Sequence, residues 1–320
     1  KTETDNKRYF LSKVNFLTFI IKVLKKSFEL EPYNVLFVDN RKAIIPALII
    51  KFLKPKKKVI LDVRELYLIH EVKHTVGKIG CVIEKIMIKK ADVLICANEF
   101  RADYMQKYFK LSKKPLVFEN LRKLEYVDAN SNVFEQKYGY IFESGKKTLI
   151  STSGVSVSRT NDKLVESLAL LSNDVQLILI GGGSKKDHQI INGIINKNSL
   201  SNRVFTLDMV SQDELKYLIE KSDIGVVNYH DLDLNNKFCA SGKVVEFIFE
   251  GKPIIATENP PLMKIVNENN IGECDNSYSN GIKTILNDYE KYKTNVLKYK
   301  SSLNIEENNK LLGYNIKLEL

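Results

Sequence analysis

Cysteine and long apolar stretches are both scarce in this chain. Its 320 residues include four cysteines, none in a Cys-x-x-Cys pair, which excludes a disulfide framework and predicts reduced, mostly buried thiols in a cytosolic protein. The longest apolar stretches, residues 14–21 and 43–50, are each closed by a lysine and fall short of the roughly 18–20 residues that a membrane-spanning helix needs. The first residue is Lys1 and no apolar signal segment follows it, so we expect the natural N-terminus to lie further upstream.

What remains is the composition of a soluble globular protein, 44% hydrophobic and 28% charged, long enough for two domains. Residues 1–150 carry 30 basic and 17 acidic side chains, a net +13, whereas residues 151–320 carry 19 basic and 22 acidic, a net −3. The basic half indicates a polyanionic partner, such as nucleic acid, an anionic membrane or a phosphate-bearing substrate. Lysine codon bias is the alternative, since 42 of the 49 basic residues are lysine, but it does not account for the asymmetry.

Short β-branched segments alternate with longer amphipathic ones, which predicts parallel sheets covered by helices. In the first half we expect strands at residues 34–39, 58–62, 92–96 and 115–118, and helices at 43–53, 82–90 and 100–109. In the second half we expect strands at 148–152, 175–180, 204–207, 223–227 and 253–256, and helices at 163–171, 186–196, 211–221 and 243–250. Both halves are therefore interpreted as doubly wound α/β domains, with a ligand in the cleft beyond the C-terminal strand ends.

Residues 128–147 are polar and interrupt this alternation, so we place the domain junction there. The predicted organisation is a Rossmann-like domain at residues 1–140, a second at 141–300 and a C-terminal tail or helix at 301–320. A basic amphipathic segment, residues 10–30, stands where such domains usually open with a strand and a glycine-rich turn.

The most informative segment is Ser-Gly-Lys-Val-Val-Glu at residues 241–246, which Gly-Lys-Pro follows at 251–253. Ser241 and Gly242 are expected to begin a helix whose free N–H groups, with Lys243 beside them, can hold an anion such as a diphosphate. Glu246 shares the face of Lys243, where its carboxylate can accept two hydrogen bonds from a ribose diol. An ordinary helix with an ion pair at this spacing explains the segment about equally well.

This segment resembles the signature of the GT-B glycosyltransferases of family 4, the glycosyl transferases group 1, in which Lys-x-x-Glu precedes Gly-Lys-Pro-Ile-Ile-Ala. Similar segments follow in the family's order through most of the chain. They are Asp-Val-Arg-Glu-Leu at residues 62–66, Ala-Asp-Val-Leu-Ile at 91–95, Val-Phe-Glu-Asn at 117–120, the loop at 154–163, Arg-Val-Phe at 203–205 and the stretch 214–227.

Three positions depart from the family pattern. The first Glu of the family's Glu-x7-Glu is Phe238, the Arg that often follows the first glycine of the donor loop is Val155, and a frequent His is Arg64. The opening strand and glycine-rich loop of the family are absent, so the resemblance implies an N-terminally incomplete chain.

The resemblance implies a retaining glycosyltransferase of the hexosyltransferase type, with two Rossmann-like domains facing a central cleft. It would move a sugar from a nucleotide diphosphate sugar, expected to be UDP-linked, to a lipid-linked or polysaccharide acceptor in cell-surface glycan synthesis. The resemblance implies no metal or other cofactor and no nucleic-acid partner. The implied catalytic residues are Arg64, Glu65, Arg159 and Lys243, and the implied donor-binding residues are Gly154, Arg159, Lys163, Gly183, Ser241, Gly242, Lys243 and Glu246.

Two other functions stay open. The missing first carboxylate and opening strand also fit a non-catalytic GT-B subunit that binds sugar or a sister subunit. The sequence His-Glu-Val-Lys-His at residues 70–74 would, on a helix, place two His and a Glu as in a zinc peptidase, although Lys73 stands inside the motif and Gly77 and Gly80 weaken a helix.

Two short motifs are interpreted as turns or loops. Asp231-Leu-Asp233 matches the Asp-x-Asp that binds metal in the GT-A fold, but its polar surroundings favour a solvated loop. Gly181-Gly-Gly-Ser184 is either a tight turn that lets the backbone approach the ligand or a plain strand–helix turn.

Residues 16–26 have apolar side chains at helical spacing, with Lys22, Lys25 and Lys26 beside them. Such a helix either packs on the core with its lysines in solvent or lies on an anionic membrane. The net +13 of the first half favours the membrane, which predicts a cytoplasmic enzyme held peripherally on the inner face of the cell membrane.

Overall fold

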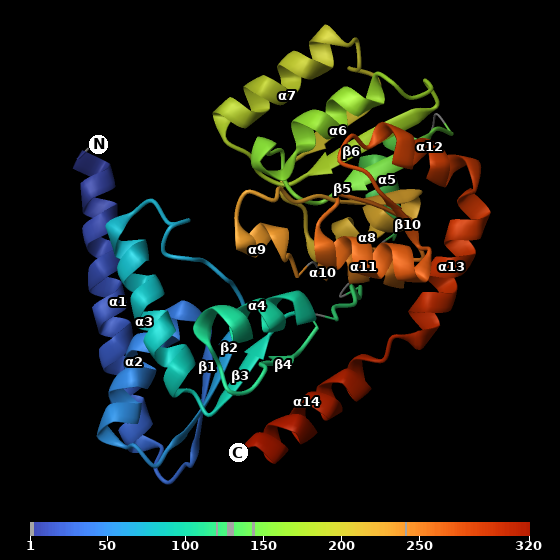
Figure 1. Ribbon diagram of the computed structural model, residues 1–320. Helices are drawn as coiled ribbons and strands as arrows, with labels where there is room; N and C mark the ends of the chain where they lie inside the picture. The colour runs from blue at the N-terminus through green and yellow to red at the C-terminus, as the bar shows by residue number, and fades with distance from the viewer. Residues whose placement is uncertain (1–2, 120, 127–130, 143–144, 241) are drawn as a thin grey trace. The chain divides into compact units, whose positions relative to one another are not determined.

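The computed structural model describes residues 3–119, 121–126, 131–142, 145–240 and 242–320, with the backbone alone for residues 3–14 and 131. The chain divides into two compact units (Figure 1). Unit 1 comprises Lys1–Glu119 and Glu307–Leu320, and unit 2 comprises Asn120–Glu306. Each unit contains one parallel β-sheet covered by helices, which confirms the predicted α/β class.

The sheet of unit 1 has four parallel strands in the order β1-β2-β3-β4. The strands are β1 (Val35–Asp39), β2 (Lys58–Val63), β3 (Val93–Cys96) and β4 (Leu116–Val117), and the helices are α1 (Glu3–Glu29), α2 (Asn40–Leu53), α3 (Thr75–Lys90), α4 (Glu99–Phe109) and α14 (Ile305–Glu319). The helix α2 packs on α1, α3, β1 and β2. All four predicted strands of this half lie within about two residues of the predicted positions, because each is a short apolar run between polar turns.

The C-terminal helix α14 belongs to unit 1 although it comes last in the sequence. Leu312 and Ile316 of α14 pack against the buried strand residues Ile60, Val93 and Ile95. Residues 301–320, expected as a tail or helix, therefore contain a helix that covers part of the first sheet (Figure 1).

The sheet of unit 2 has six parallel strands in the order β10-β9-β8-β5-β6-β7. The strands are β5 (Lys147–Ser151), β6 (Val175–Ile180), β7 (Val204–Leu207), β8 (Ile224–Val227), β9 (Ile254–Ala256) and β10 (Gly272–Cys274). The chain moves from β5 outward to β6 and β7, then returns to place β8 on the other side of β5. The sheet therefore has a topological switch point between β5 and β8, where ligands of doubly wound folds bind.

Nine α-helices are described in unit 2 before the chain returns to unit 1. They are α5 (Ser131–Phe142), α6 (Asn161–Leu168), α7 (Lys185–Lys197), α8 (Gln212–Lys221), α9 (Leu234–Lys237), α10 (Gly242–Phe249), α11 (Pro260–Asn269), α12 (Ser279–Asn287) and α13 (Tyr289–Ser302). The helix α8 begins with a capping box, in which the Ser211 hydroxyl accepts a hydrogen bond from the Glu214 N–H and the Glu214 carboxylate accepts one from the Ser211 N–H.

The predicted junction at residues 128–147 is wrong, because much of this segment is the helix α5. Phe134, Tyr138 and Ile141 recur at helical spacing and pack in the core of unit 2, and the side chain of Gln176 donates to the Ile141 carbonyl at 2.7 Å. The division of contacts falls instead between residues 119 and 120, and residues 307–320 return to unit 1, so the units differ from the predicted domains at both boundaries. The many polar residues on the exposed face of α5 made the segment resemble a linker, although its apolar residues recur at helical spacing.

None of the helices in the described ranges has both the length and the apolar character that crossing a bilayer takes.

Candidate active site

Two loops leave the sheet of unit 2 at its topological switch point. The loop after β5 carries Gly154 and Arg159, and the loop after β8 carries Tyr229 and leads into α9, which carries Asn236. Loops at the C-terminal ends of these neighbouring strands form the crevice in which doubly wound sheets hold a ligand. The structure therefore brings the predicted Gly154 and Arg159 to the position that the topology favours.

The glycines at the ends of β5 and β6 allow the two loops to touch backbone to backbone. Gly154 has φ +85°, and a Cβ on it would stand 2.5 Å from the Gly182 carbonyl oxygen. A Cβ on Gly183 would stand 2.0 Å from the Val155 carbonyl oxygen. Side chains at either position would force the loops apart. The glycine run is thus a close-approach turn, and it fixes the loop that carries Arg159.

The helix α10 is held tightly against β8 by its apolar face. Its Phe247 is fully buried, and a Cβ on Gly225 of β8 would stand 2.3 Å from the Phe247 ring. Because Gly225 has no side chain, the ring lies directly on the strand. This packing fixes the register of α10 and so the positions of Lys243 and Glu246, which lie one turn apart.

Arg159 is oriented by contacts from the loop after β8. Its guanidinium Nη1 donates to Asn236 Oδ1 at 3.2 Å, and its guanidinium carbon lies 4.5 Å from the centre of the Tyr229 ring. Asn236 is held in turn by the carboxylate of Asp233, at 3.0 and 2.8 Å from its amide nitrogen. An arginine stacked on a ring and bonded at one edge keeps the rest of its donor fork for a ligand.

Lys243 lies in a poorly solvated environment beside a second cation, Arg159. Its pKa is lowered to about 8, chiefly because burial disfavours the charged ammonium and secondly because Arg159 is nearby, while Glu246 opposes the shift. A cation crowded by another cation gains when an anion binds between them. This cluster is therefore suited to a phosphate group.

Glu246 is the buried carboxylate of the same cluster, with an exposed fraction of 7%. Burial raises its pKa, and the positive charges of Arg122 and Lys243 oppose the rise. The Arg122 Nε atom lies 3.4 Å from Glu246 Oε1. Charged carboxylates are almost never this buried without partners. Arg122 is therefore the counter-charge that allows Glu246 to be buried as an anion.

Two buried polar atoms at the switch point have no hydrogen-bond partner among the described residues, Thr152 Oγ1 and Asn228 Oδ1. They follow β5 and β8 directly. The Asn228 amide nitrogen itself donates to Asn161 Oδ1 at 2.8 Å, and the Asn161 amide nitrogen donates to the Gly154 carbonyl. Orphaned polar atoms in an otherwise satisfied network are typical of a place where a ligand or water binds.

The glycosyl transferases group 1 family matches residues 136–301, which is more than half of the chain and includes every residue of this cluster except Arg122. The chain belongs to this family. No curated protein sequence matches the chain.

Solved structures share the GT-B fold of this glycosyltransferase family member. Sucrose-phosphate synthase (tll1590) from Thermosynechococcus elongatus superimposes with a TM-score of 0.73 at 18% identity, over 94% of this chain and 77% of that one. Anabaena Alr3699/HepE in complex with UDP superimposes with a TM-score of 0.72 at 15% identity, over 93% of this chain and 81% of that one. WaaG, a glycosyltransferase involved in lipopolysaccharide biosynthesis, gives 0.60 at 14% identity, over 83% and 80%.

The remaining donor-site predictions for this glycosyltransferase fall in several places. Gly242 begins α10, as predicted, and Lys163 is exposed in the first turn of α6, next to the Arg159 loop in sequence. Ser241 lies outside the described residues. Sequence reasoning missed Arg122, which contacts Glu246, and it missed Tyr229 and Asn236, which hold Arg159.

Arg64 and Glu65 follow β2 in unit 1 and are both exposed. The Arg64 Nε atom lies 2.8 Å from Asp39 Oδ1 and 3.3 Å from Asp62 Oδ2, so two carboxylates at the ends of β1 and β2 hold its guanidinium. Its backbone carbonyl accepts from Arg101 Nη1 at 2.5 Å. Arg64 is thus a positioned cation at the C-terminal edge of the first sheet of the glycosyltransferase, where parallel sheets place functional side chains.

The zinc peptidase alternative is wrong for this glycosyltransferase family member. Residues 70–74 form a turn and loop, and α3 begins only at Thr75, with His74 as the residue before it. The helix face that would bring His70 and His74 together is not formed, and the Glu71 carboxylate accepts from the Leu68 N–H at 2.9 Å. In the described part of the chain, no group of three His, Cys, Asp or Glu side chains is suited to a metal.

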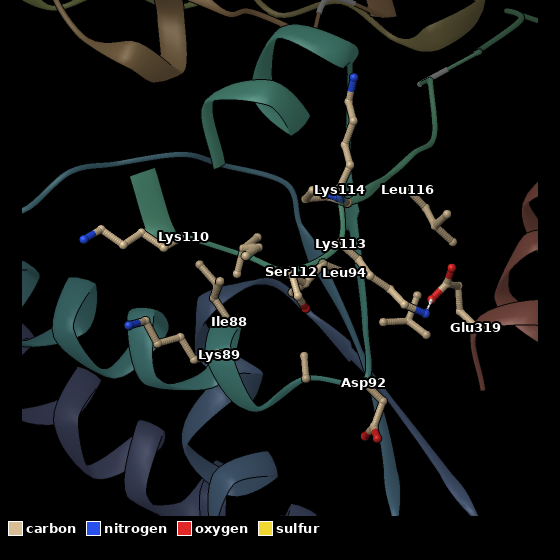
Figure 2. Close-up of a pocket in the computed structure, with 14 residues that line it drawn as sticks. Ile88, Lys89, Asp92, Leu94, Lys110, Ser112, Lys113, Lys114, Leu116 and Glu319 are labelled. Atoms are coloured by element: carbon tan, nitrogen blue, oxygen red, sulfur yellow. Dashed lines mark hydrogen bonds and ion pairs between the residues drawn. The ribbon is translucent and has the colours of Figure 1, made fainter. Parts of the chain in front are cut away.

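A hollow of about 360 Å³ lies in unit 1 of the glycosyltransferase, at the N-terminal ends of β3 and β4. Ile88 and Leu94 line it, with lysines at its rim, and Figure 2 shows Lys113 reaching across to Glu319 of α14, at 2.5 Å. This is the strand end opposite to the one at which such sheets bind ligands. The Lys113–Glu319 contact ties α14 to the unit.

Proposed function

We propose that this protein is an active glycosyltransferase that takes a sugar from a UDP-linked donor and transfers it, with retention, to a lipid-linked or polysaccharide acceptor in cell-surface glycan synthesis. The observation that carries the proposal is the cluster of Arg159, Lys243 and Glu246 at the switch point of unit 2. A buried cation of lowered pKa, a stacked arginine and a buried carboxylate are the groups that a nucleoside diphosphate requires.

The donor is expected to lie with its diphosphate on Arg159, Lys243 and the first N–H groups of α10, and with its ribose on Glu246. Three cations, Arg122, Arg159 and Lys243, and the carboxylate of Glu246 give 3 − 1 = +2 charges in the cluster. A diphosphate diester carries about two negative charges near neutral pH, which this cluster neutralises. Lys163, in the first turn of α6 and four residues after Arg159, is a further cation for the phosphates.

The catalytic step that we propose breaks the bond between the anomeric carbon and the diphosphate oxygen, and the electron pair stays on the diphosphate. An acceptor hydroxyl oxygen forms the new bond to that carbon, and the proton of that hydroxyl passes to the departing diphosphate oxygen. Because the diphosphate gains negative charge in the transition state, Arg159 and Lys243 stabilise the transition state more than the bound donor. We expect these cations to act without a metal ion, and we assign Arg64 and Glu65 to the sugar or acceptor.

The choice of UDP is supported by the Anabaena Alr3699/HepE structures, which were obtained with UDP and with UDP-glucose. The expectation of a cell-surface acceptor is supported by WaaG, which is involved in lipopolysaccharide biosynthesis. Retention and the type of acceptor come from the family resemblance.

Nucleotide binding is the direct test of this function. We expect UDP to raise the unfolding temperature of the purified chain more than GDP or ADP, because a ligand at 100 times its dissociation constant adds about 2.7 kcal/mol to the free energy of unfolding. We further expect release of UDP from a UDP-sugar in the presence of EDTA. Absence of a shift with every nucleotide would contradict the proposal, whereas UDP binding without turnover of any UDP-sugar would favour the non-catalytic GT-B subunit.

We also propose that unit 1 docks on an anionic membrane and holds the enzyme at the cytoplasmic face. Leu17 and Ile21 of α1 are 60% and 65% exposed. Lys25 and Lys26 extend from the same helix with side chains that are 78% and 64% exposed, and each lies within 4 Å of Glu29. Exposed apolar residues beside lysines on one helix fit a surface that enters the headgroup region.

Vesicle co-sedimentation tests this docking. We expect binding to phosphatidylcholine vesicles that contain phosphatidylglycerol, and less binding at 1 M than at 0.1 M salt, because the Debye length falls from about 10 Å to about 3 Å. Replacing Lys22, Lys25 and Lys26 with Gln should weaken binding, since each lysine near an anionic surface contributes about 1 kcal/mol. The matched control replaces the exposed Lys283, Lys291 and Lys298 of unit 2. Equal binding to neutral and anionic vesicles would contradict the docking proposal, and codon bias would then explain the lysine content.

A further inference from the structure

The segment that precedes α5 is firmly fixed to unit 2. Leu124 is 1% exposed and lies in the core of the unit. The Glu125 carbonyl accepts from Gln212 Nε2 at 3.0 Å, and the Tyr126 hydroxyl donates to the Glu220 carboxylate. These anchors hold residues 121–126 against α8, so the backbone that carries Arg122 is fixed by packing rather than by its own ion pair.

Arg122 is the residue of this segment that reaches the candidate donor site. Its Nε atom lies 3.4 Å from Glu246 Oε1, while its side chain remains 55% exposed and that of Glu246 only 9%. The arginine is therefore a partly exposed partner of a carboxylate that is almost wholly removed from solvent. Because a guanidinium is charged at every accessible pH, it offers Glu246 a permanent counter-charge.

The other charged groups around Glu246 do not offer it a positive counter-charge that stays the same at every pH. Lys243, on the same helix, has a pKa of about 8 and is partly neutral in mildly alkaline solution. Arg159 contributes to the lowered pKa of Lys243, whereas the charges that act on the pKa of Glu246 are those of Arg122 and Lys243. At the far end of α10, Glu250 is paired with Lys216 at 2.8 Å and is directed to α8.

We propose that Arg122 is a positioning residue of the donor site, which keeps Glu246 ionised and oriented so that its two oxygens accept both hydroxyls of the donor ribose. This inference rests on the proposed nucleotide function. An ionised carboxylate accepts both hydrogen bonds, whereas a protonated one turns one of its oxygens into a donor and loses half of the diol interaction. Arg122 thus acts on the ribose through Glu246.

The pH profile of nucleotide affinity distinguishes this role from a purely structural one. In the Arg122→Gln variant, burial acts on Glu246 without its counter-charge, so the carboxyl should become protonated at a higher pH. The ratio of the variant's UDP dissociation constant to the wild-type value should therefore grow as pH falls from about 8 to about 5.5, by up to about tenfold for each unit of pKa shift. Taking the ratio cancels the titration of the phosphates themselves.

Isothermal titration calorimetry measures these dissociation constants, and three comparisons sharpen the experiment. Arg122→Lys keeps the charge and should restore most of the affinity and the flat ratio. Lys123→Gln removes the neighbouring cation, which lies 3.5 Å from Glu125, and should leave the ratio flat. The 2′-deoxy form of UDP should bind the wild type about tenfold more weakly, in line with loss of one hydrogen bond to a charged group, and this penalty should shrink in Arg122→Gln at low pH.

The possible outcomes separate this inference from the proposed function. A ratio that does not change with pH, in a protein that binds UDP, overturns the role of Arg122 and leaves the nucleotide site standing. A wild-type protein that binds no nucleoside diphosphate overturns both. A ratio that rises toward low pH in Arg122→Gln alone supports the assignment.

Discussion

Replacing Lys243 with Met is expected to reduce sugar transfer by about 10²–10³-fold, the loss that follows removal of one preorganised group that stabilises developing charge. The protein should fold normally, because Met occupies a similar volume and removes a poorly solvated cation that lies near Arg159. The measurement is the rate of UDP release from a UDP-sugar at saturating donor, together with the unfolding temperature.

The lowered pKa of Lys243 gives this prediction a pH signature. A bound diphosphate favours the protonated amine, so wild-type UDP affinity should be full below the pKa of about 8 and fall by up to about tenfold per pH unit above it. Stability should change in the opposite direction. Between pH 8 and 10.5 the unfolded chain binds more protons at this site than the folded protein, so this group makes the free energy of unfolding rise with pH. In Lys243→Met both effects should vanish.

Lys252 provides a matched control. It is a lysine of the same unit whose pKa is also lowered by burial, but it precedes β9 and donates to the Glu220 carbonyl at 2.7 Å, at the strand end opposite to the site. Lys252→Met should leave transfer within about twofold of the wild type, as is usual for changes remote from the reacting groups. Equal losses in the two variants would contradict the assignment of Lys243 to the diphosphate.

Replacing Glu246 with Gln should weaken UDP binding by about 1.5–3 kcal/mol, the contribution of hydrogen bonds to a charged group, which corresponds to roughly 10–150-fold. Gln is nearly isosteric with Glu. The substitution also removes the cost of burying a charged carboxylate, which is the effect that raises the pKa of Glu246, so the unfolding temperature should not fall. Isothermal titration calorimetry with UDP measures the effect. Inorganic pyrophosphate, which lacks both the ribose and the uracil, serves as the diphosphate probe for the phosphate half alone. Affinity for the diphosphate probe should change little.

The exposed Glu268 of α11 is the control, and Glu268→Gln should bind UDP like the wild type. Unchanged UDP affinity in Glu246→Gln would remove the ribose from this carboxylate. A parallel loss for UDP and for the diphosphate probe would instead place Glu246 near the phosphates.

Much of the fold and part of the candidate site could be predicted from local patterns. The strands around Ile60, Ile178 and Val226 are short apolar runs between turns, and such runs are recognisable without knowledge of their neighbours. The capping box at Ser211 and the start of α10 at Gly242 are likewise local, because cap residues contact only the first turn of their own helix.

Other features depended on contacts that local patterns do not contain. The helix α5 has a polar exposed face, and only its packing against α8 identifies Tyr138 as a core residue. The sequence His-Glu-Val-Lys-His at residues 70–74 matched a zinc motif, but the chain turns there before α3 begins. A motif gives ligand spacing only after the backbone conformation is known.

The sequence by itself determined the α/β class, the family, the glycines that let the β5 and β6 loops touch, and the presence of Lys243 and Glu246 on one helix face. Only the tertiary structure decided which groups surround them. Arg122 reaches Glu246, and Tyr229 and Asn236 hold Arg159, from segments that are distant in sequence. The physical reason is that secondary structure follows from interactions within a few residues, whereas the charge state of a buried group depends on every partner that folding brings near it.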